Sequence, residues 1–228
     1  MINVKIRLFA ALKELIGKNI LDIGVPEGST VKDVVETISK TYPDAKEIFR
    51  ISRYAVNMEY QNDGIKLSDG DEITVIMPVS GGISAADISE DNRRRIKITS
   101  EKIDAGKVLD FISDPSAGSV LLFNGAVRNN EEGKPVEYLF YEAYEEMAVK
   151  ELKKLIDAAF SAFNITKVFV IHRIGRIDIG DLSISIGISS PHRDDSYLAS
   201  KFLIDNIKET VPIWKKEFAG GAGEWKRL

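Results

Sequence analysis

Apolar and polar positions in the first third of the chain follow two different periods. Residues 2–8 alternate between apolar and polar side chains, which is typical of a half-buried strand. Thr30 and Asp33 form a capping box, and the apolar residues that follow recur at helical spacing. These patterns predict strands over residues 2–8, 20–25, 53–58 and 73–78, and helices over residues 10–16 and 31–42.

The order of these elements predicts the fold of this part. Two strands, a helix and two further strands, followed by Gly81-Gly82, describe a ubiquitin-like β-grasp domain over residues 1–82. Residues 83–95 combine small, polar and charged side chains without a period, so we expect a linker there.

The remaining residues alternate strand and helix patterns and predict an α+β domain over residues 96–228. Five strands are expected at 95–99, 119–123, 136–144, 167–173 and 182–189, and three helices at 107–112, 146–160 and 196–211. Pro212 ends the last helix, because proline breaks the helical hydrogen-bond pattern.

Composition narrows the class of protein. A chain of 228 residues with 44% hydrophobic residues is long enough for two packed domains. No apolar run approaches the ~18 residues of a membrane span, so we expect a cytoplasmic protein without membrane contact. The net charge of -4 is spread evenly along the chain, which argues against nucleic-acid binding.

The sequence contains no cysteine. This excludes disulfides, cysteine-ligated metal sites and cysteine nucleophiles, and we expect neither a metal nor a cofactor. A protein without a thiol also has no side chain for carrying sulfur as a persulfide.

Gly81-Gly82 is the first candidate for chemistry. Two glycines are thin and flexible enough to enter a narrow tunnel that side chains would block. A glycine carboxylate at the end of such a tail can be adenylated and converted to a thiocarboxylate, which holds sulfur on the main chain. The alternative is a simple hinge between domains, and the β-grasp pattern before the pair favours the tail.

Two groups of cations are candidates for binding an anion. Arg128 follows the strand that contains Phe123, in a glycine-containing loop where a guanidinium can hold an anion bidentately. His192 and Arg193 lie at a strand-to-helix junction, where helix amides also favour anions. The alternatives are a surface salt bridge for Arg128 and a capping or core role for His192. His172 lies within an apolar strand and fits a core histidine.

Lys208 and Lys215 form a third candidate group. Lys208 falls in the last turn of a helix, where the helix dipole favours a cation whatever its function. Lys215 lies beyond Pro212 and next to Trp214, whose apolar ring would favour the neutral amine needed for proton transfer. Surface lysines are common, and Trp214 also fits a plain core position.

Taken together, these residues resemble the two subunits of molybdopterin synthase. Residues 1–82 are similar to the small, sulfur-carrying subunit. Five motifs are similar, in order, to those of the large, catalytic subunit, whose fold is of the α/β-hammerhead type: the loop of residues 123–128, Tyr141-Glu142-Ala143-Tyr144, His172-Arg173-Ile174-Gly175, residues 189–193 and residues 212–217.

The resemblance implies a sulfurtransferase of molybdenum cofactor biosynthesis. The family inserts two sulfurs, delivered as the small subunit's thiocarboxylate, into cyclic pyranopterin monophosphate, opening the cyclic phosphate and creating the dithiolene of molybdopterin. It implies that Lys208 and Lys215 line the reaction site as electrostatic or proton-transfer groups. It further implies that Arg128, His192 and Arg193 contact phosphate and pterin, and that Phe123 forms a pocket wall.

The resemblance also implies partners: an adenylating enzyme for the carrier domain and a second copy of the catalytic domain. In the family a basic residue near the C-terminus reaches the partner's site, and Lys226 and Arg227 are the candidates for it here. Ile204 stands where the family can have methionine. Ile83 follows Gly82, whereas the family's carrier ends at its second glycine, so we expect cleavage after Gly82.

The sequence leaves two alternatives open. In the first, the fusion stays uncut, its first domain is structural, and separate carrier proteins deliver the sulfur. In the second, the chain is a ubiquitin-like interaction protein without catalysis, which leaves the set of cations unexplained.

Overall fold

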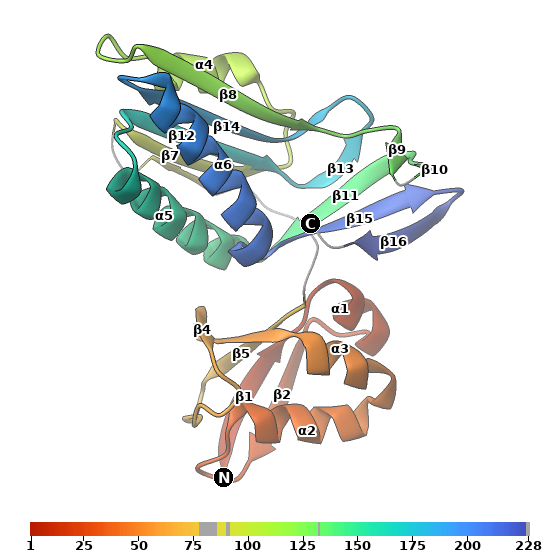
Figure 1. Cartoon of the computed structure of the whole chain (residues 1–228). Coiled ribbons are helices and arrows are strands. Elements are labelled where there is room, and N and C mark those ends of the chain that lie inside the picture. The colour runs from red at the N-terminus through yellow and green to blue at the C-terminus, as the bar shows by residue number, and fades with distance from the viewer. Residues whose placement is uncertain (78–85, 90–91, 132, 227–228) are drawn as a thin grey trace. The chain divides into compact units, whose positions relative to one another are not determined.

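The computed structural model describes residues 1–77, 86–89, 92–131 and 133–226 (Figure 1). The chain divides into two compact units, Met1–Val79 and Ser80–Lys226. Each unit combines helices with strands, as the sequence predicts.

The first unit is built on one five-stranded sheet. Its elements are β1 (Ile2–Arg7), α1 (Ala10–Ile16), β2 (Ile20–Val25), α2 (Val31–Thr41), the 3₁₀ turn η1 (Pro43–Ala45), α3 (Lys46–Ile51), β3 (Arg53–Val56), β4 (Glu59–Gln61) and β5 (Glu72–Ile76). The strand order is β2-β1-β5-β3-β4, with β1 and β5 parallel and the other neighbours antiparallel. This is the β-grasp arrangement that the sequence predicted.

The alternation in β1 and the capping box of α2, both predicted from the sequence, are present in this unit. Ile2, Val4 and Ile6 of β1 are buried, whereas the residues between them face solvent. At the start of α2 the Thr30 hydroxyl accepts a hydrogen bond from the Asp33 amide at 3.3 Å, and the Asp33 carboxylate accepts one from the Thr30 amide at 2.7 Å. The capping box therefore satisfies two amides that the first helical turn leaves without partners.

One predicted strand is shorter than expected. The sequence predicted a strand over residues 53–58, but β3 ends at Val56 because Asn57 and Met58 have φ angles of 50° and 63°. These left-handed conformations turn the chain directly into β4, which was not predicted. The short helix α3 was also not predicted, and it buries Phe49.

The described residues of the second unit form two main sheets and three helices. Its elements are β6 (Ala86–Ser89), β7 (Arg94–Thr99), α4 (Ala105–Ile112), β8 (Ser119–Ala126), β9 (Asn130–Glu131), β10 (Lys134–Pro135), β11 (Tyr138–Ala143), α5 (Glu145–Ala162), β12 (Lys167–Arg173), β13 (Gly175–Asp178), β14 (Leu182–Ser190), α6 (Arg193–Thr210), β15 (Ile213–Ala219) and β16 (Ala222–Lys226). The sheets have the orders β6-β7-β12-β14-β8 and β13-β11-β15-β16, and β9 pairs with β10. Within the described part of the chain, no helix is long and apolar enough to cross a membrane.

Helices cover both faces of the five-stranded sheet of the second unit. Figure 1 shows α5 and α6 on one face and α4 on the other. The main core, under α5 and α6, includes Ile98, Val170 and Ile186, while Val108 of α4 packs with Phe169 on the opposite face. Burying each such side chain contributes roughly 1.5–3 kcal/mol, so these layers fix the positions of the strand ends that carry the candidate site.

The segment expected to be a linker, residues 83–95, contains a strand. β6 pairs antiparallel with β7, with Ala86 opposite Ile98 and Ser89 opposite Arg95. The Arg93 guanidinium donates hydrogen bonds to the carbonyl oxygens of Thr166 and Ile165 at 3.0 and 3.1 Å. The second unit therefore begins its sheet inside the expected linker, because Ala86–Ser89 complete an edge next to β7. Gly81 and Gly82 lie outside the described residues.

Candidate active site

Among the predicted cations whose side chains the structure describes, Lys215 is the best shielded. It lies in β15, where it faces Tyr141 of β11 across the strand pair, and its side chain is only 14% exposed. Its Nζ atom lies 2.7 Å from Oε1 of Glu217, whose side chain is 9% exposed. Because residues two apart on a strand share a face, the strand itself places this carboxylate beside the ammonium.

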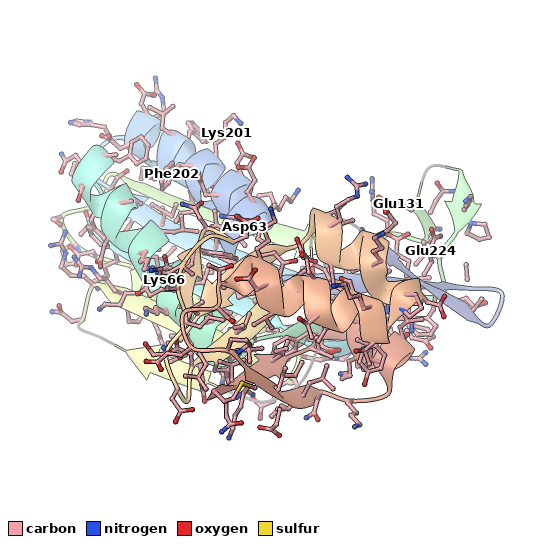
Figure 2. The ribbon with its side chains drawn as sticks, turned by 90° about the horizontal axis from the view of Figure 1, so that it is seen from below. Asp63, Lys66, Glu131, Lys201, Phe202 and Glu224 are labelled. Atoms are coloured by element: carbon pink, nitrogen blue, oxygen red, sulfur yellow. The ribbon has the colours of Figure 1, made fainter. Side chains whose placement is uncertain are left out.

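Arg128 joins the same cluster through a second carboxylate. It lies in the loop after β8, and its Nη2 atom contacts Oε2 of Glu131 at the start of the β9–β10 hairpin. The other oxygen of Glu131, Oε1, lies 4.0 Å from Nζ of Lys215. Figure 2 labels Glu131 in this part of the second unit. Two cations and two carboxylates therefore form one connected group.

Tyr141 borders this group and stays uncharged. Burial raises the pKa of its hydroxyl to about 12, and the nearby carboxylates of Glu217 and Glu131 add to the rise, whereas a hydrogen bond with Ser183 acts in the opposite direction. The Ser183 hydroxyl also donates to the carbonyl oxygen of Gly125 at 3.1 Å, at the end of β8. A neutral phenol therefore lines the cluster beside Lys215.

His172 lies behind Tyr141 and is a core residue. Its ring packs edge-on against the Tyr141 ring with centroids 5.2 Å apart, and burial lowers its pKa to about 4. Its Nδ1 atom is 2.8 Å from the carbonyl oxygen of Arg173, so the neutral ring donates there. This geometry agrees with the core histidine that the sequence predicted.

Comparisons with known proteins identify both halves of the chain. The MoaE protein family matches residues 98–210, and the ThiS family matches residues 6–82. A molybdopterin synthase catalytic subunit of Dictyostelium discoideum is 43% identical over 61% of this chain and 90% of its own length. The chain belongs to the MoaE family. Its first domain is a ThiS-family domain fused to the MoaE domain in one polypeptide.

Solved structures give the same assignment for the MoaE domain. The crystal structure of molybdopterin synthase from Staphylococcus aureus is 38% identical, with a TM-score of 0.54 over 57% of this chain and 94% of that chain. A chain from the complex of subunits 1 and 2 of the molybdopterin-converting factor of Helicobacter pylori 26695 is 20% identical, with a TM-score of 0.50 over 58% of this chain and 90% of that chain. At that identity the second likeness supports the fold alone.

Three predicted site residues of the MoaE domain lie on α6 or directly before it. His192 is the N-cap of this helix without a side-chain capping bond, Arg193 is 81% exposed and lies 3.8 Å from Asp194, and Lys208 is exposed in the last turn. Among the described residues, no ion pair joins these three to the cluster around Lys215. Their roles at the site stay predictions.

Phe123 lies in β8 and packs, partly buried, against the main core. It stands opposite Ile186 of β14, two residues along the strand from Gly125. A methyl group on Gly125 would lie 2.7 Å from Ile184, so glycine is needed for this strand to pack closely. The role of Phe123 as a pocket wall stays a prediction.

Trp214 does not form the apolar wall that the sequence suggested for Lys215. Its side chain is 1% exposed, and because neighbouring residues on a strand point to opposite faces, it packs away from the Lys215 side. The alternative interpretation, a core tryptophan, agrees with the structure. Tyr141 occupies the position beside Lys215 instead.

Two carboxylates of the cluster were not predicted as site residues. Glu217 carries a detectable signal, since it follows Lys215 by two positions on a strand and must share its face. Glu131 carries no comparable signal. Its approach to Lys215 depends on how the β9–β10 hairpin packs near β15.

Proposed function

We propose that this chain makes molybdopterin by transferring sulfur from a thiocarboxylate on Gly82 to cyclic pyranopterin monophosphate, forming the dithiolene. Membership of the MoaE family, with a ThiS-family domain on the same chain, supports molybdopterin synthase activity in molybdenum cofactor biosynthesis. The observation that carries the proposal is the shielded Lys215, held by Glu217 and linked through Glu131 to Arg128.

The proposed roles follow from charge and exposure. Arg128 is 72% exposed and open to an incoming phosphate, which a guanidinium binds bidentately. His192 and Arg193 at the start of α6 would contact the phosphate and pterin, and Phe123 would form a wall of the pocket. Lys215 and Lys208 would stabilise negative charge or transfer protons as the carbon–sulfur bond forms.

The carrier function requires a free carboxyl group at Gly82. Since Ile83 follows Gly82 in the chain, a protease must cut there before an adenylating enzyme can activate the glycine. Each thiocarboxylate then gives up its sulfur to the substrate and takes an oxygen from water, which regenerates the carboxylate. We further propose a homodimer of the MoaE domain in which Lys226 or Arg227 reaches the partner's site.

Intact mass spectrometry of the protein from its native host tests this proposal. We expect a fragment of residues 1–82, part of it heavier by the replacement of one oxygen with sulfur, together with a fragment that begins at Ile83. A fully uncut chain that still makes molybdopterin would contradict cleavage.

One observation favours a second candidate, the uncut fusion. As encoded, Gly82 is bonded to Ile83, so its carbonyl is an amide and accepts no sulfur. The ThiS-family domain would then be structural, and separate carriers would supply sulfur to the MoaE domain. In that case, deleting residues 1–82 leaves activity with an added thiocarboxylated carrier unchanged.

A further inference from the structure

Glu131 holds an unusual place among the charges of the candidate site. Its Oε2 atom contacts Arg128, the residue proposed to bind the substrate's phosphate, while its Oε1 atom lies 4.0 Å from the Lys215 ammonium. Lys215 already has a close carboxylate in Glu217 at 2.7 Å. Among the ion pairs of the described residues, Glu131 alone connects the two cations.

We propose that Glu131 is an internal counter-ion: it occupies the anion subsite of Arg128 in the empty enzyme and shifts toward Lys215 when a phosphate group binds. The inference rests on the proposed function, in which Arg128 receives the phosphate. It makes Glu131 a positioning residue that couples occupation of the phosphate subsite to the environment of Lys215.

The exposure of each partner determines which ion pair gives way. The Arg128 side chain is 72% exposed and that of Glu131 is 31% exposed, so water competes with their contact, and such exposed pairs are weak. The Lys215–Glu217 pair, at 14% and 9% exposure, is shielded. A phosphate group can bring two oxygens to the guanidinium, whereas the contact with Glu131 is through Oε2, so a phosphate displaces Glu131 from Arg128 and leaves Glu217 in place.

The released carboxylate has a nearby destination. Glu131 lies in a two-residue strand, opposite Lys134 in β10, so its backbone is held and the proposed shift requires only a turn of its side chain. The cation next to it on the cluster side is Lys215. Closing the 4.0 Å gap to Nζ places a second carboxylate against the ammonium, which fixes its position when the substrate arrives.

Nuclear magnetic resonance of the full-length chain tests the coupling. The probe is inorganic phosphate, titrated at constant ionic strength while the side-chain resonances of Arg128 and Lys215 are followed. In Glu131→Gln the competing charge is gone, so we expect phosphate to bind about two- to five-fold more tightly than in the wild type. Phosphate should shift the Lys215 ammonium resonance in the wild type and have little effect on it in Glu131→Gln.

Two further variants make the result interpretable. Glu47→Gln is the matched control, because Glu47 forms the same kind of exposed pair with an arginine three residues away, Arg50, at 2.8 Å in the other domain. It should leave phosphate affinity unchanged. Arg128→Gln removes the subsite and should weaken phosphate binding at least about tenfold.

The outcomes separate the two proposals. If Arg128→Gln weakens phosphate binding but Glu131→Gln leaves it unchanged or weaker, the counter-ion role is wrong and the phosphate subsite stands. If Arg128→Gln binds phosphate as the wild type does, both the subsite and the counter-ion role are wrong. A Lys215 resonance that responds equally in wild type and Glu131→Gln would also contradict the coupling.

Discussion

Exchanging Lys215 for methionine removes the ammonium while keeping the length and the apolar stem of the side chain. The change leaves the Glu217 carboxylate, only 9% exposed, without its partner at 2.7 Å. At an effective dielectric constant of about 20, two unit charges at this separation attract by roughly 6 kcal/mol, which is a ceiling because desolvation opposes it. Removing one partner from a fully buried pair lowers the free energy of unfolding by about 3–5 kcal/mol. Because Lys215 and Glu217 keep some exposure, we expect Lys215→Met to lower it by about 2–3 kcal/mol.

The matching variant Glu217→Gln should cost a similar amount, because it leaves the shielded ammonium with only the more distant Glu131. The double variant Lys215→Met/Glu217→Gln removes both charges and should recover to within about 1 kcal/mol of the wild type. Molybdopterin formation should fall by roughly 100-fold or more in Lys215→Met and in the double variant alike. Adding Glu217→Gln to Lys215→Met would thus restore stability but not activity.

Urea denaturation followed by tryptophan fluorescence measures the stabilities. The chain has two tryptophans, Trp214 and Trp225, and both lie in the second unit, so the signal reports the unfolding of this unit. The matched control is Asp178→Asn, which breaks an exposed pair of the same spacing, Arg176–Asp178 at 2.9 Å, and should cost less than about 1 kcal/mol. A double variant whose loss equals the sum of the single losses would refute the stabilising pair, and restored activity in it would refute the chemical role of Lys215.

Much of the first domain was predictable because its signals are local. The alternation in β1 and the capping box at Thr30 act over a few residues, so the sequence alone reveals them. The end of β3 depends on left-handed backbone at Asn57 and Met58, residue types that do not demand it. The missed strand β4 follows from that turn.

The candidate site was predictable only where its arrangement follows from a local pattern along the chain. Strand periodicity is enough to place Glu217 beside Lys215, and it also shows that Trp214 must face the other way. The contact between Glu131 and Lys215 joins a hairpin to a strand far along the sequence. Such a contact depends on tertiary packing, which no local pattern encodes.

Two further predictions concern the packing of the MoaE domain. Burial holds the pKa of His172 at about 4, below its ordinary value of 6.5, so its contribution to stability is complete above pH 6.5 and is lost as the pH falls through 4. His172→Gln should therefore flatten the pH dependence of urea stability in this window, by at most about 1.4 kcal/mol per pH unit. Gly187→Ala would place a methyl group 2.6 Å from Val108, and we expect a loss of about 1–3 kcal/mol in thermal unfolding, against little change for Gly64→Ala, where nothing lies within 4 Å.

Fusing a carrier to its own enzyme has a consequence that follows from the chemistry at Gly82. A covalent tether normally raises the effective concentration of one domain near the other, often to the millimolar range. The carbonyl carbon of Gly82, however, can be bonded either to the nitrogen of Ile83 or to the sulfur of a thiocarboxylate, but not to both. A carrier domain that is still tethered therefore holds no thiocarboxylate at Gly82. Under the proposed cleavage, the fusion therefore supplies equal amounts of the two domains and loses the gain in effective concentration before any sulfur is transferred. The rate of molybdopterin formation by the cut protein should then depend on dilution, as for two separate subunits, and a rate independent of concentration would require that the two fragments remain bound after the cut.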